Sequence, residues 1–203
     1  MWRLVKDEGG MTIWERNNPL SRILAVRART TMKASIEQIV HILLSPDADQ
    51  KRRWVDLVSE WEEIERGPDV AVVYAAYALP FPLSPRDFVL KVTREVDTRA
   101  KTVTIKLCSV KHQSFPESRS IGVRGRVKEM RFKARMISRT KTEVTLEAQV
   151  DLGGDLPNWA VNIMNRAWPE NTLRGLEAEA VCTKKARPGT MTSLARRALT
   201  LQH

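Results

Sequence analysis

Cysteine and histidine, which often bind metals or take part in catalysis, are scarce in this sequence of 203 residues. Its two cysteines, Cys108 and Cys182, lie far apart and outside any metal-type spacing, so we expect two free thiols rather than a disulfide framework. The three histidines, His41, His112 and His203, stand singly. Neither a Gly-x-Ser-x-Gly motif nor a glycine-rich phosphate loop is present. These absences argue against an enzyme and against a bound metal or cofactor.

Long apolar runs are also absent, and no stretch approaches the roughly 18 residues that a membrane-spanning helix needs. The first six residues are followed at once by Asp7 and Glu8, which is not the pattern of a secretory signal peptide. If Met1 is the natural start, we therefore expect a cytoplasmic protein. The length favours one domain, which we assign to residues 1–183, followed by a basic tail at 184–203.

The net charge of +10 is concentrated in two regions. The tail at 184–203 has five Lys or Arg residues and no acidic residue, and 119–141 has nine basic residues against Glu129 alone. Such patches are either solvated faces or docking surfaces for an anionic membrane or a nucleic acid. Single-strand binders interleave aromatic platforms with basic residues, and 119–141 has only Phe132. Nucleic-acid binding is therefore the weakest of these alternatives.

Alternating apolar and polar residues predict an antiparallel sheet of about eight or nine strands. Between Lys128 and Glu129 the apolar phase slips by one residue, which indicates a bulge or a tight turn. Ser35 and Gln38 form a capping-box pattern ahead of one short helix, and Asp47 can cap a second. The predicted strands cover 12–16, 24–32, 58–66, 70–79, 88–96, 103–107, 121–137 and 144–152; the predicted helices cover 36–43 and 48–54.

After the last strand, Gly153 and Gly154 release the backbone, and a long helix is expected from Pro157 to about Val181 with a bend at Pro169. Its first half carries one broad apolar arc. This helix is either a kinked core helix or the roof of a cavity, and in the second case its arc lines the ligand. The residues of the arc that we assign to ligand binding are Trp159, Ala160, Ile163, Met164 and Ala167.

The strand at 70–79 is apolar on both faces, and the hydroxyls of Tyr74 and Tyr77 are its only polar side-chain groups. Small residues cluster there and on the closing helix, and flexible methionines such as Met130 occur on neighbouring strands. Such a composition is typical either of tight packing or of a sheet closed over an interior space.

Two motifs resemble those of the StAR-related lipid-transfer (START) domains. The segment at 80–89, Pro-Phe-Pro-Leu-Ser-Pro-Arg-Asp-Phe-Val, resembles the family's Pro-x-Pro…Arg-Asp signature. The segment Asp-Leu-Gly-Gly-Asp-Leu-Pro-Asn-Trp at 151–159, with Asn162 beyond it, resembles the start of the family's last helix. The opening residues and Trp54 also look like the family, and the resemblance extends from about Trp2 to Ala180.

This resemblance implies an α+β helix-grip fold, in which a curved antiparallel sheet of about nine strands wraps around a long C-terminal helix. Two short helices near the N-terminus and an internal apolar tunnel belong to the same fold. The implied function is non-catalytic binding and transfer of one lipid, a sterol or a phospholipid, by a monomer without a cofactor. Several members carry a second arginine six residues after the motif arginine, where this chain has Val92. That difference implies a tunnel with less buried charge.

Arg86 and Asp87 have two interpretations: a local ion pair that pins the strand, or a guanidinium that meets a phosphate or hydroxyl at the end of the tunnel. With the second, we add Arg86, Phe88 and Val92 to the ligand-binding residues, together with the two tyrosines. The turn at 97–101 and the first half of the closing helix are expected to gate the cavity at an anionic membrane. The predicted membrane contacts are Arg99, Lys101 and Trp168.

A cyclase-like enzyme of the same fold, similar to polyketide cyclases, is the main alternative. It needs titratable groups inside the cavity, and the sequence offers only Tyr74, Tyr77 and Arg86.

Overall fold

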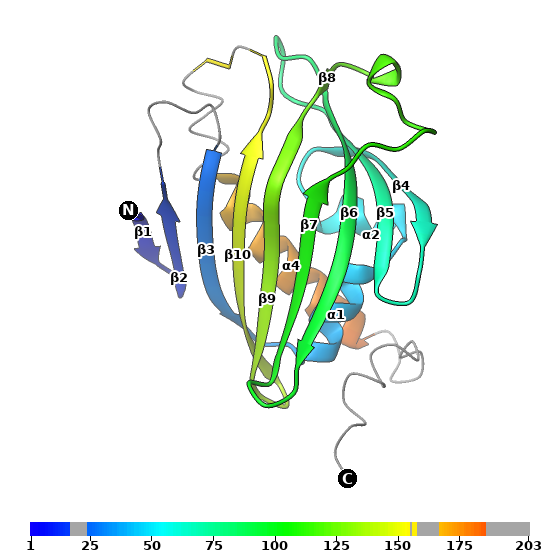
Figure 1. Ribbon diagram of the computed structural model, residues 1–203. Helices are drawn as coiled ribbons and strands as arrows, with labels where there is room; N and C mark the ends of the chain where they lie inside the picture. The colour runs from blue at the N-terminus through cyan, green and yellow to red at the C-terminus, as the bar shows by residue number, and fades with distance from the viewer. Residues whose placement is uncertain (17–23, 155, 158–166, 186–203) are drawn as a thin grey trace.

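One antiparallel sheet with helices packed on one of its faces forms the protein (Figure 1). The computed structural model describes residues 1–16, 24–154, 156–157 and 167–185. The strand order is β1-β2-β3-β10-β9-β7-β6-β5-β4, and the short β8 pairs in parallel with β6. The described elements are β1 (Arg3–Glu8), β2 (Met11–Glu15), β3 (Leu24–Met32), α1 (Ile36–Leu44), α2 (Ala48–Trp54), β4 (Val58–Arg66), β5 (Val70–Tyr77), β6 (Arg86–Asp97), β7 (Thr102–Ser109), a 3-10 helix η1 (Glu117–Arg119), β8 (Val123–Arg124), β9 (Arg126–Ser138), β10 (Lys141–Asp151) and α4 (Trp168–Lys185).

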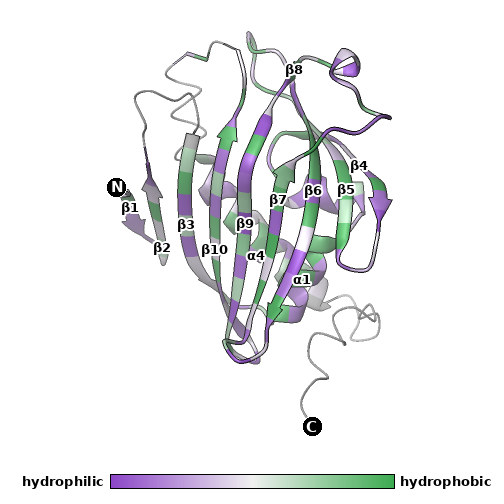
Figure 2. Ribbon diagram, in the orientation of Figure 1, coloured by the Kyte–Doolittle hydropathy of each residue, from purple (hydrophilic) through white to green (hydrophobic). Residues whose placement is uncertain are grey.

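The two faces of the sheet differ as the alternation predicts, which is visible in the banded colouring of the strands (Figure 2). Along β10, Val144, Leu146 and Ala148 are buried against the helices. Between them, Glu147 points outward and pairs with Arg27 on β3 at 2.7 Å and with Arg131 on β9 at 2.9 Å. The inner face therefore carries the core, and the outer face carries cross-strand ion pairs.

Both short helices begin at the caps predicted from the sequence. The Ser35 side chain accepts a hydrogen bond from the backbone N–H of Gln38 at 3.3 Å, and the Gln38 side chain accepts one from the backbone N–H of Ser35 at 2.9 Å. Asp47 accepts bonds from the backbone N–H groups of Asp49 and Gln50 at 2.9 and 3.1 Å. These reciprocal bonds satisfy amides that the first helical turn leaves free, and both predictions are confirmed.

The predicted phase slip is a β-bulge at Lys128. On β10, Gln149 pairs with Glu129 and the next residue, Val150, pairs with Val127, so Lys128 has no partner there. The chain before the bulge divides into β8 and β9 at Gly125. A Cβ at Gly125 would lie 2.3 Å from the Phe88 ring, so glycine allows the strand to pass over an inward-facing aromatic side chain.

The structure describes the predicted closing helix at Pro157 and from Ala167 onward. Pro157 is not helical, Ala167 is helical, and α4 covers Trp168–Lys185 with Pro169 as its second residue. Residues 158–166 lie outside the described part, and with them the expected first half of the helix. The second half is confirmed as core: Leu173, Leu176 and Ala180 are fully buried.

Polar contacts from several elements hold α4 in place. Glu179 accepts hydrogen bonds from Gln50 at 3.1 Å and from Arg53 at 2.9 and 3.1 Å. At the other end of α4, Glu170 pairs with Lys6 of β1 at 2.9 Å. Among the described residues, no helix is long and apolar enough to cross a bilayer.

Candidate functional site

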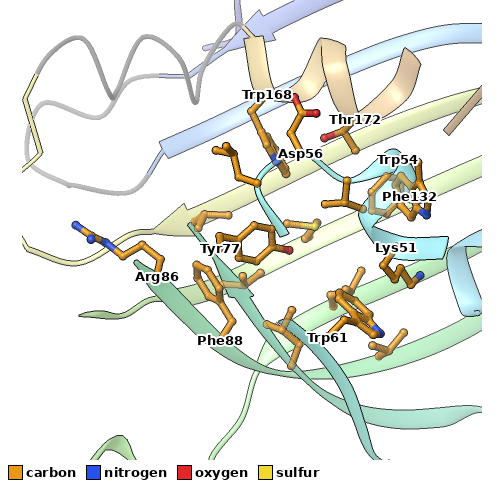
Figure 3. Close-up of a pocket in the computed structure, with 18 of the residues that line it drawn as sticks. Lys51, Trp54, Asp56, Trp61, Tyr77, Arg86, Phe88, Phe132, Trp168 and Thr172 are labelled. Carbon is orange, nitrogen blue, oxygen red and sulfur yellow. The ribbon is translucent and has the colours of Figure 1, made fainter. Parts of the chain in front are cut away.

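An apolar cavity lies between the inner face of the sheet, α2 and the beginning of α4 (Figure 3). Its volume is about 90 Å³. One buried water needs roughly 10–15 Å³ on this scale, so the cavity has room for more than a few waters. Inward-facing side chains of β6, β7, β9 and β10 supply the apolar walls, among them Leu90, Ile105, Leu107, Val127, Met130 and Val150.

The cavity opens where its lining residues reach the surface. Asp56 and Leu57, which connect α2 to β4, are both exposed, and Leu79, just after β5, is half-buried. Trp168 at the start of α4 is half-buried beside them, and Figure 3 shows Asp56 and Trp168 close together. The segment 78–85 that follows β5 therefore borders the opening.

Arg86 lines one end of the cavity and is only 3% exposed. Its guanidinium donates to the carbonyl oxygens of Leu152 at 2.7 Å, Ser84 at 2.5 Å and Gly153 at 3.4 Å. Gly153 and Gly154 have φ of 64° and 65°, a conformation that favours glycine and places these carbonyls beside the arginine. Burial lowers the pKa of Arg86. The arginine thus connects the segment before β6 to the turn that follows β10.

The local ion pair between Arg86 and Asp87 is not formed, so that interpretation is wrong. Successive residues of a strand point to opposite faces, and Asp87 is fully buried on the outer side of β6. There it accepts from Arg124 at 3.0 Å and from Ser120 at 2.6 Å. The Arg-Asp dipeptide therefore supplies two separate attachments, one for each face of the sheet.

Tyr77 and Tyr74 also lie on opposite faces of the sheet, because they are three positions apart on one strand. Tyr77 lines the cavity, and its ring contacts that of Phe88 edge-to-face at 5.7 Å. Tyr74 stacks on Phe115 at 4.4 Å in a second apolar cluster beneath the loop after β7. The prediction that Tyr74 lines the cavity is corrected accordingly. Burial raises the pKa of both tyrosines to about 12, and Asp87 contributes for Tyr74.

Among the other predicted ligand-binding residues, Phe88 and Val92 join Tyr77 and Arg86 in the lining. Ala167 is exposed and is not among the residues that line the cavity. The remaining residues of the predicted arc lie outside the described part of the chain: Trp159, Ala160, Ile163 and Met164.

The predicted membrane contacts are separated as well. Trp168 is half-buried in the cavity lining, whereas Arg99 and Lys101 are exposed on the turn between β6 and β7. On β6 the cavity lining extends from Arg86 to Val92, and the turn at 97–101 follows the far end of this strand. Ile105 on β7 also lines the cavity and pairs with Arg94 of β6, so at about 3.3 Å per residue the turn begins about 10 Å beyond the lining. No residue of this turn lines the cavity, and the predicted gate at 97–101 stays a prediction.

Sequence reasoning missed the residues on the α2 side of the cavity, Lys51, Trp54 and Trp61. Lys51 belongs to a charged run that reads as a solvated helix, yet it is 2% exposed. A usable signal was present, because residues three apart share a helix face and Trp54 marks the inward face of α2. Lys51 therefore had to point inward too.

Few groups in this cavity can take part in acid–base chemistry. Among the described lining residues, the titratable side chains are Lys51, Asp56, Tyr77 and Arg86, without a histidine or a pair of carboxylates. No cluster of three His, Cys, Asp or Glu side chains that could hold a metal occurs in the described residues.

A sheet that grips a C-terminal helix around an apolar cavity is found in known proteins. The family model of the START domain matches residues 1–167. The chain belongs to the START domain family. An uncharacterised protein of Pseudomonas aeruginosa is 28% identical over 180 residues, which are 88% of this chain and 86% of that protein.

Two further relatives of this START chain have informative names. The phosphatidylcholine transfer protein of the mouse is 25% identical over 179 residues, covering 86% of this chain and 81% of that protein. The crystal structure of human STARD10 superposes with a TM-score of 0.81 at 22% identity, covering 97% of this chain and 81% of that one. The helix-grip fold expected from the sequence is therefore confirmed.

Proposed function

We propose that this START chain binds one lipid, of the sterol or phospholipid class, in its cavity and transfers it between membranes without catalysis. The observation that carries the proposal is the apolar cavity between the inner face of the sheet and α4, in a chain that belongs to this family. The similarity to phosphatidylcholine transfer protein supports transfer as the purpose of binding.

A carrier of this kind lowers a kinetic barrier. A sixteen-carbon chain passing through water would cost about 13 kcal/mol, at about 0.8 kcal/mol per methylene. The membrane shelters the chain already, so the cavity needs only an equally apolar lining. Extraction is then close to balanced, and the barrier falls because the chain is never fully exposed to water.

The opening at Asp56, Leu57 and Leu79 is the natural entrance in this proposal. Trp168 and the segment 78–85 border it on two sides, and separating them would enlarge it. Phe81, in the middle of this segment, is 96% exposed. An exposed aromatic side chain beside the entrance suits insertion into the interfacial region of a bilayer.

Basic residues would add weak attraction to an anionic membrane, at about 1 kcal/mol for each Lys or Arg near the surface. The region 119–141 and the exposed turn residues Arg99 and Lys101 are the candidates. Several basic side chains of the outer face already pair with Glu143 and Glu147, so docking depends on the unpaired remainder.

The alternative of a cyclase-like enzyme lacks support from the cavity, because its described lining offers no histidine and only one carboxylate, Asp56, at the surface. Nucleic-acid binding is less favoured, because the rings of Trp2 and Trp14 on the outer face are already covered by Arg27 and Arg29, at 4.6 and 5.4 Å from their centroids.

Two measurements test the proposal. Native mass spectrometry of the purified protein should detect one bound lipid, and the protein should move a fluorescent sterol or phosphatidylcholine between vesicles. Met130→Trp fills the cavity and should abolish transfer while circular dichroism stays unchanged. Ile137→Trp, at an exposed position of the same strand, is the control and should transfer normally. Unimpaired transfer by Met130→Trp would contradict the assignment of the cavity.

A further inference from the structure

A buried lysine without a carboxylate partner lies on one side of the cavity. Lys51 Nζ donates to the carbonyl oxygens of Ile42 at 3.1 Å and Leu43 at 2.8 Å, at the end of α1. An ammonium group has three donors, so one N–H has no oxygen acceptor within the described structure. No described carboxylate forms an ion pair with this lysine, although its side chain is 2% exposed.

Two tryptophans add further unused donors beside it. Lys51 Nζ lies 5.2 Å from the ring centroid of Trp54 and 4.8 Å from that of Trp61. The indole N–H groups of both tryptophans are buried and have no hydrogen-bond partner. An indole N–H can only donate. Figure 3 shows the nitrogen atoms of these three residues on the same side of the cavity, remote from Arg86.

The Tyr77 hydroxyl faces the same side. Figure 3 shows it pointing from the middle of the cavity toward Lys51 and Trp54, and it has no hydrogen-bond partner in the described residues. Because burial raises the pKa of Tyr77 to about 12, this hydroxyl keeps its proton and can donate at neutral pH. The two indole N–H groups and the third N–H of Lys51 therefore lie without partners on the side of the cavity toward which the Tyr77 hydroxyl points.

Buried donors without partners and a buried cation are both costly, and a bound anion would relieve both costs at once. The charges around Lys51 do not supply this compensation. Arg66 repels the lysine, Glu63 attracts it only from a distance, and burial is the main cause that lowers the pKa of Lys51 to about 7.

We propose that Lys51, Trp54 and Trp61 form a subsite for an anionic oxygen group of the bound lipid, a carboxylate or a phosphate monoester. This inference rests on the proposed lipid binding and names the head-group chemistry within it. Both groups present acceptors only, which matches the donors around the subsite. A quaternary ammonium is disfavoured, because Lys51 already places a cation against both indole rings and would repel another.

Calorimetric titration of the full chain with four single-chain probes tests the subsite. Palmitate and lysophosphatidic acid carry the anionic oxygen group, hexadecanol carries a neutral one, and hexadecyltrimethylammonium carries a cation. We expect palmitate to bind about tenfold or more tightly than hexadecanol, as one charge-assisted hydrogen bond would give. Lys51→Met should remove this preference, whereas Lys51→Arg and the surface control Lys101→Met should keep it.

Indole nitrogen NMR signals give a readout that does not depend on the lysine variants. Palmitate should shift the N–H resonances of Trp54 and Trp61, because both gain an acceptor, and hexadecanol should shift them less. Lysophosphatidic acid acting in the same way would extend the subsite to phosphate; palmitate acting alone would restrict it to carboxylate.

Three results would overturn the subsite. They are equal affinities for palmitate and hexadecanol in the unmodified protein, a palmitate preference that survives Lys51→Met, and the tightest binding by the cationic probe. Each leaves the proposed lipid binding intact, because a probe still enters the cavity. Failure of all four probes to bind would instead overturn the proposed function together with the subsite.

Discussion

The cavity has a buried cation at each of two places, and the two are held in different ways. Arg86 donates to the carbonyls of Leu152, Ser84 and Gly153, and these bonds tie together two segments that are distant in the sequence. Lys51 donates to only two carbonyls at the end of α1 and rests against indole rings. The comparison teaches that Arg86 is a structural connection between distant segments, whereas Lys51 is bonded only to the end of α1 and is the group to which our proposal assigns a ligand.

The largest expected effect is a loss of stability when Arg86 is replaced. Arg86→Met leaves the buried carbonyl of Leu152 and the half-buried one of Gly153 without their donors, at about 1–3 kcal/mol for a buried group, and also leaves a cavity. We expect the free energy of unfolding to fall by about 3 kcal/mol or more, measured by urea denaturation. Lys51→Met should change it by less than about 1 kcal/mol, because an apolar side chain of similar size replaces a buried charge. Equal losses for the two variants would break the comparison; Arg99→Met is the surface control.

A smaller loss is expected where α4 meets α2 on the Lys51 side. A Cβ at Gly175 would lie 2.4 Å from the backbone oxygen of Trp54, and neither backbone can yield without moving a helix. Gly175→Ala should lower the unfolding free energy by about 2 kcal/mol despite the better helix propensity of alanine. Val181→Ala, at an exposed position of the same helix, should cost less than about 0.5 kcal/mol. Unchanged stability of Gly175→Ala would show that the two helices are not in close contact.

The third effect in size is the contribution of Lys51 to the pH dependence of stability. Burial, the largest cause, lowers the pKa of Lys51 from 10.5 to about 7. Between these values the unfolded chain binds more protons than the folded one, so stability from this group rises with pH. From pH 7 to pH 9, the unfolding free energy of the unmodified protein should rise by about 1–2 kcal/mol relative to Lys51→Met. Parallel pH profiles would mean that the lysine keeps its ordinary pKa.

The smallest effect on stability is expected for a change at Phe81, in the segment that leads to Arg86. The same change should have a clear effect on membrane binding. Phe81 is 96% exposed, so Phe81→Ser should leave the unfolding free energy within about 0.5 kcal/mol of the original. Its binding to vesicles that contain phosphatidylserine should weaken several-fold in a sedimentation assay. Ile137→Ser, at an exposed position on β9, is the matched control. Equal vesicle binding by the two variants would remove the segment 78–85 from the docking surface.

The sequence determined the elements and their order, because hydrophobic alternation and capping act between near neighbours. The capping box at Ser35 and Gln38, the cap at Asp47 and the bulge at Lys128 all follow from residues within a few positions of one another. The motifs at 80–89 and 151–159 likewise indicated the family, which the match over residues 1–167 confirms.

Part of the site was also predictable, since Tyr77, Arg86, Phe88 and Val92 line the cavity. The error at Tyr74 was avoidable, because the period of a strand already places it opposite Tyr77. The predicted gate at 97–101 stays a prediction, because local patterns do not decide whether a turn lies near a cavity. The sequence gives the order of the turns, whereas the distance of each turn from the cavity depends on how far the lining extends along β6.

Only the tertiary structure decided which partners the buried charges have. Arg86 meets carbonyls from residues 66 and 67 positions away, and Asp87 meets Arg124 across the loop after β7. Lys51 lies in a charged run of the sequence and is nevertheless enclosed by Trp61 and the end of α1. The physical reason is that propensity and periodicity act locally, whereas the cost of a buried charge depends on which distant groups the fold brings within hydrogen-bonding distance.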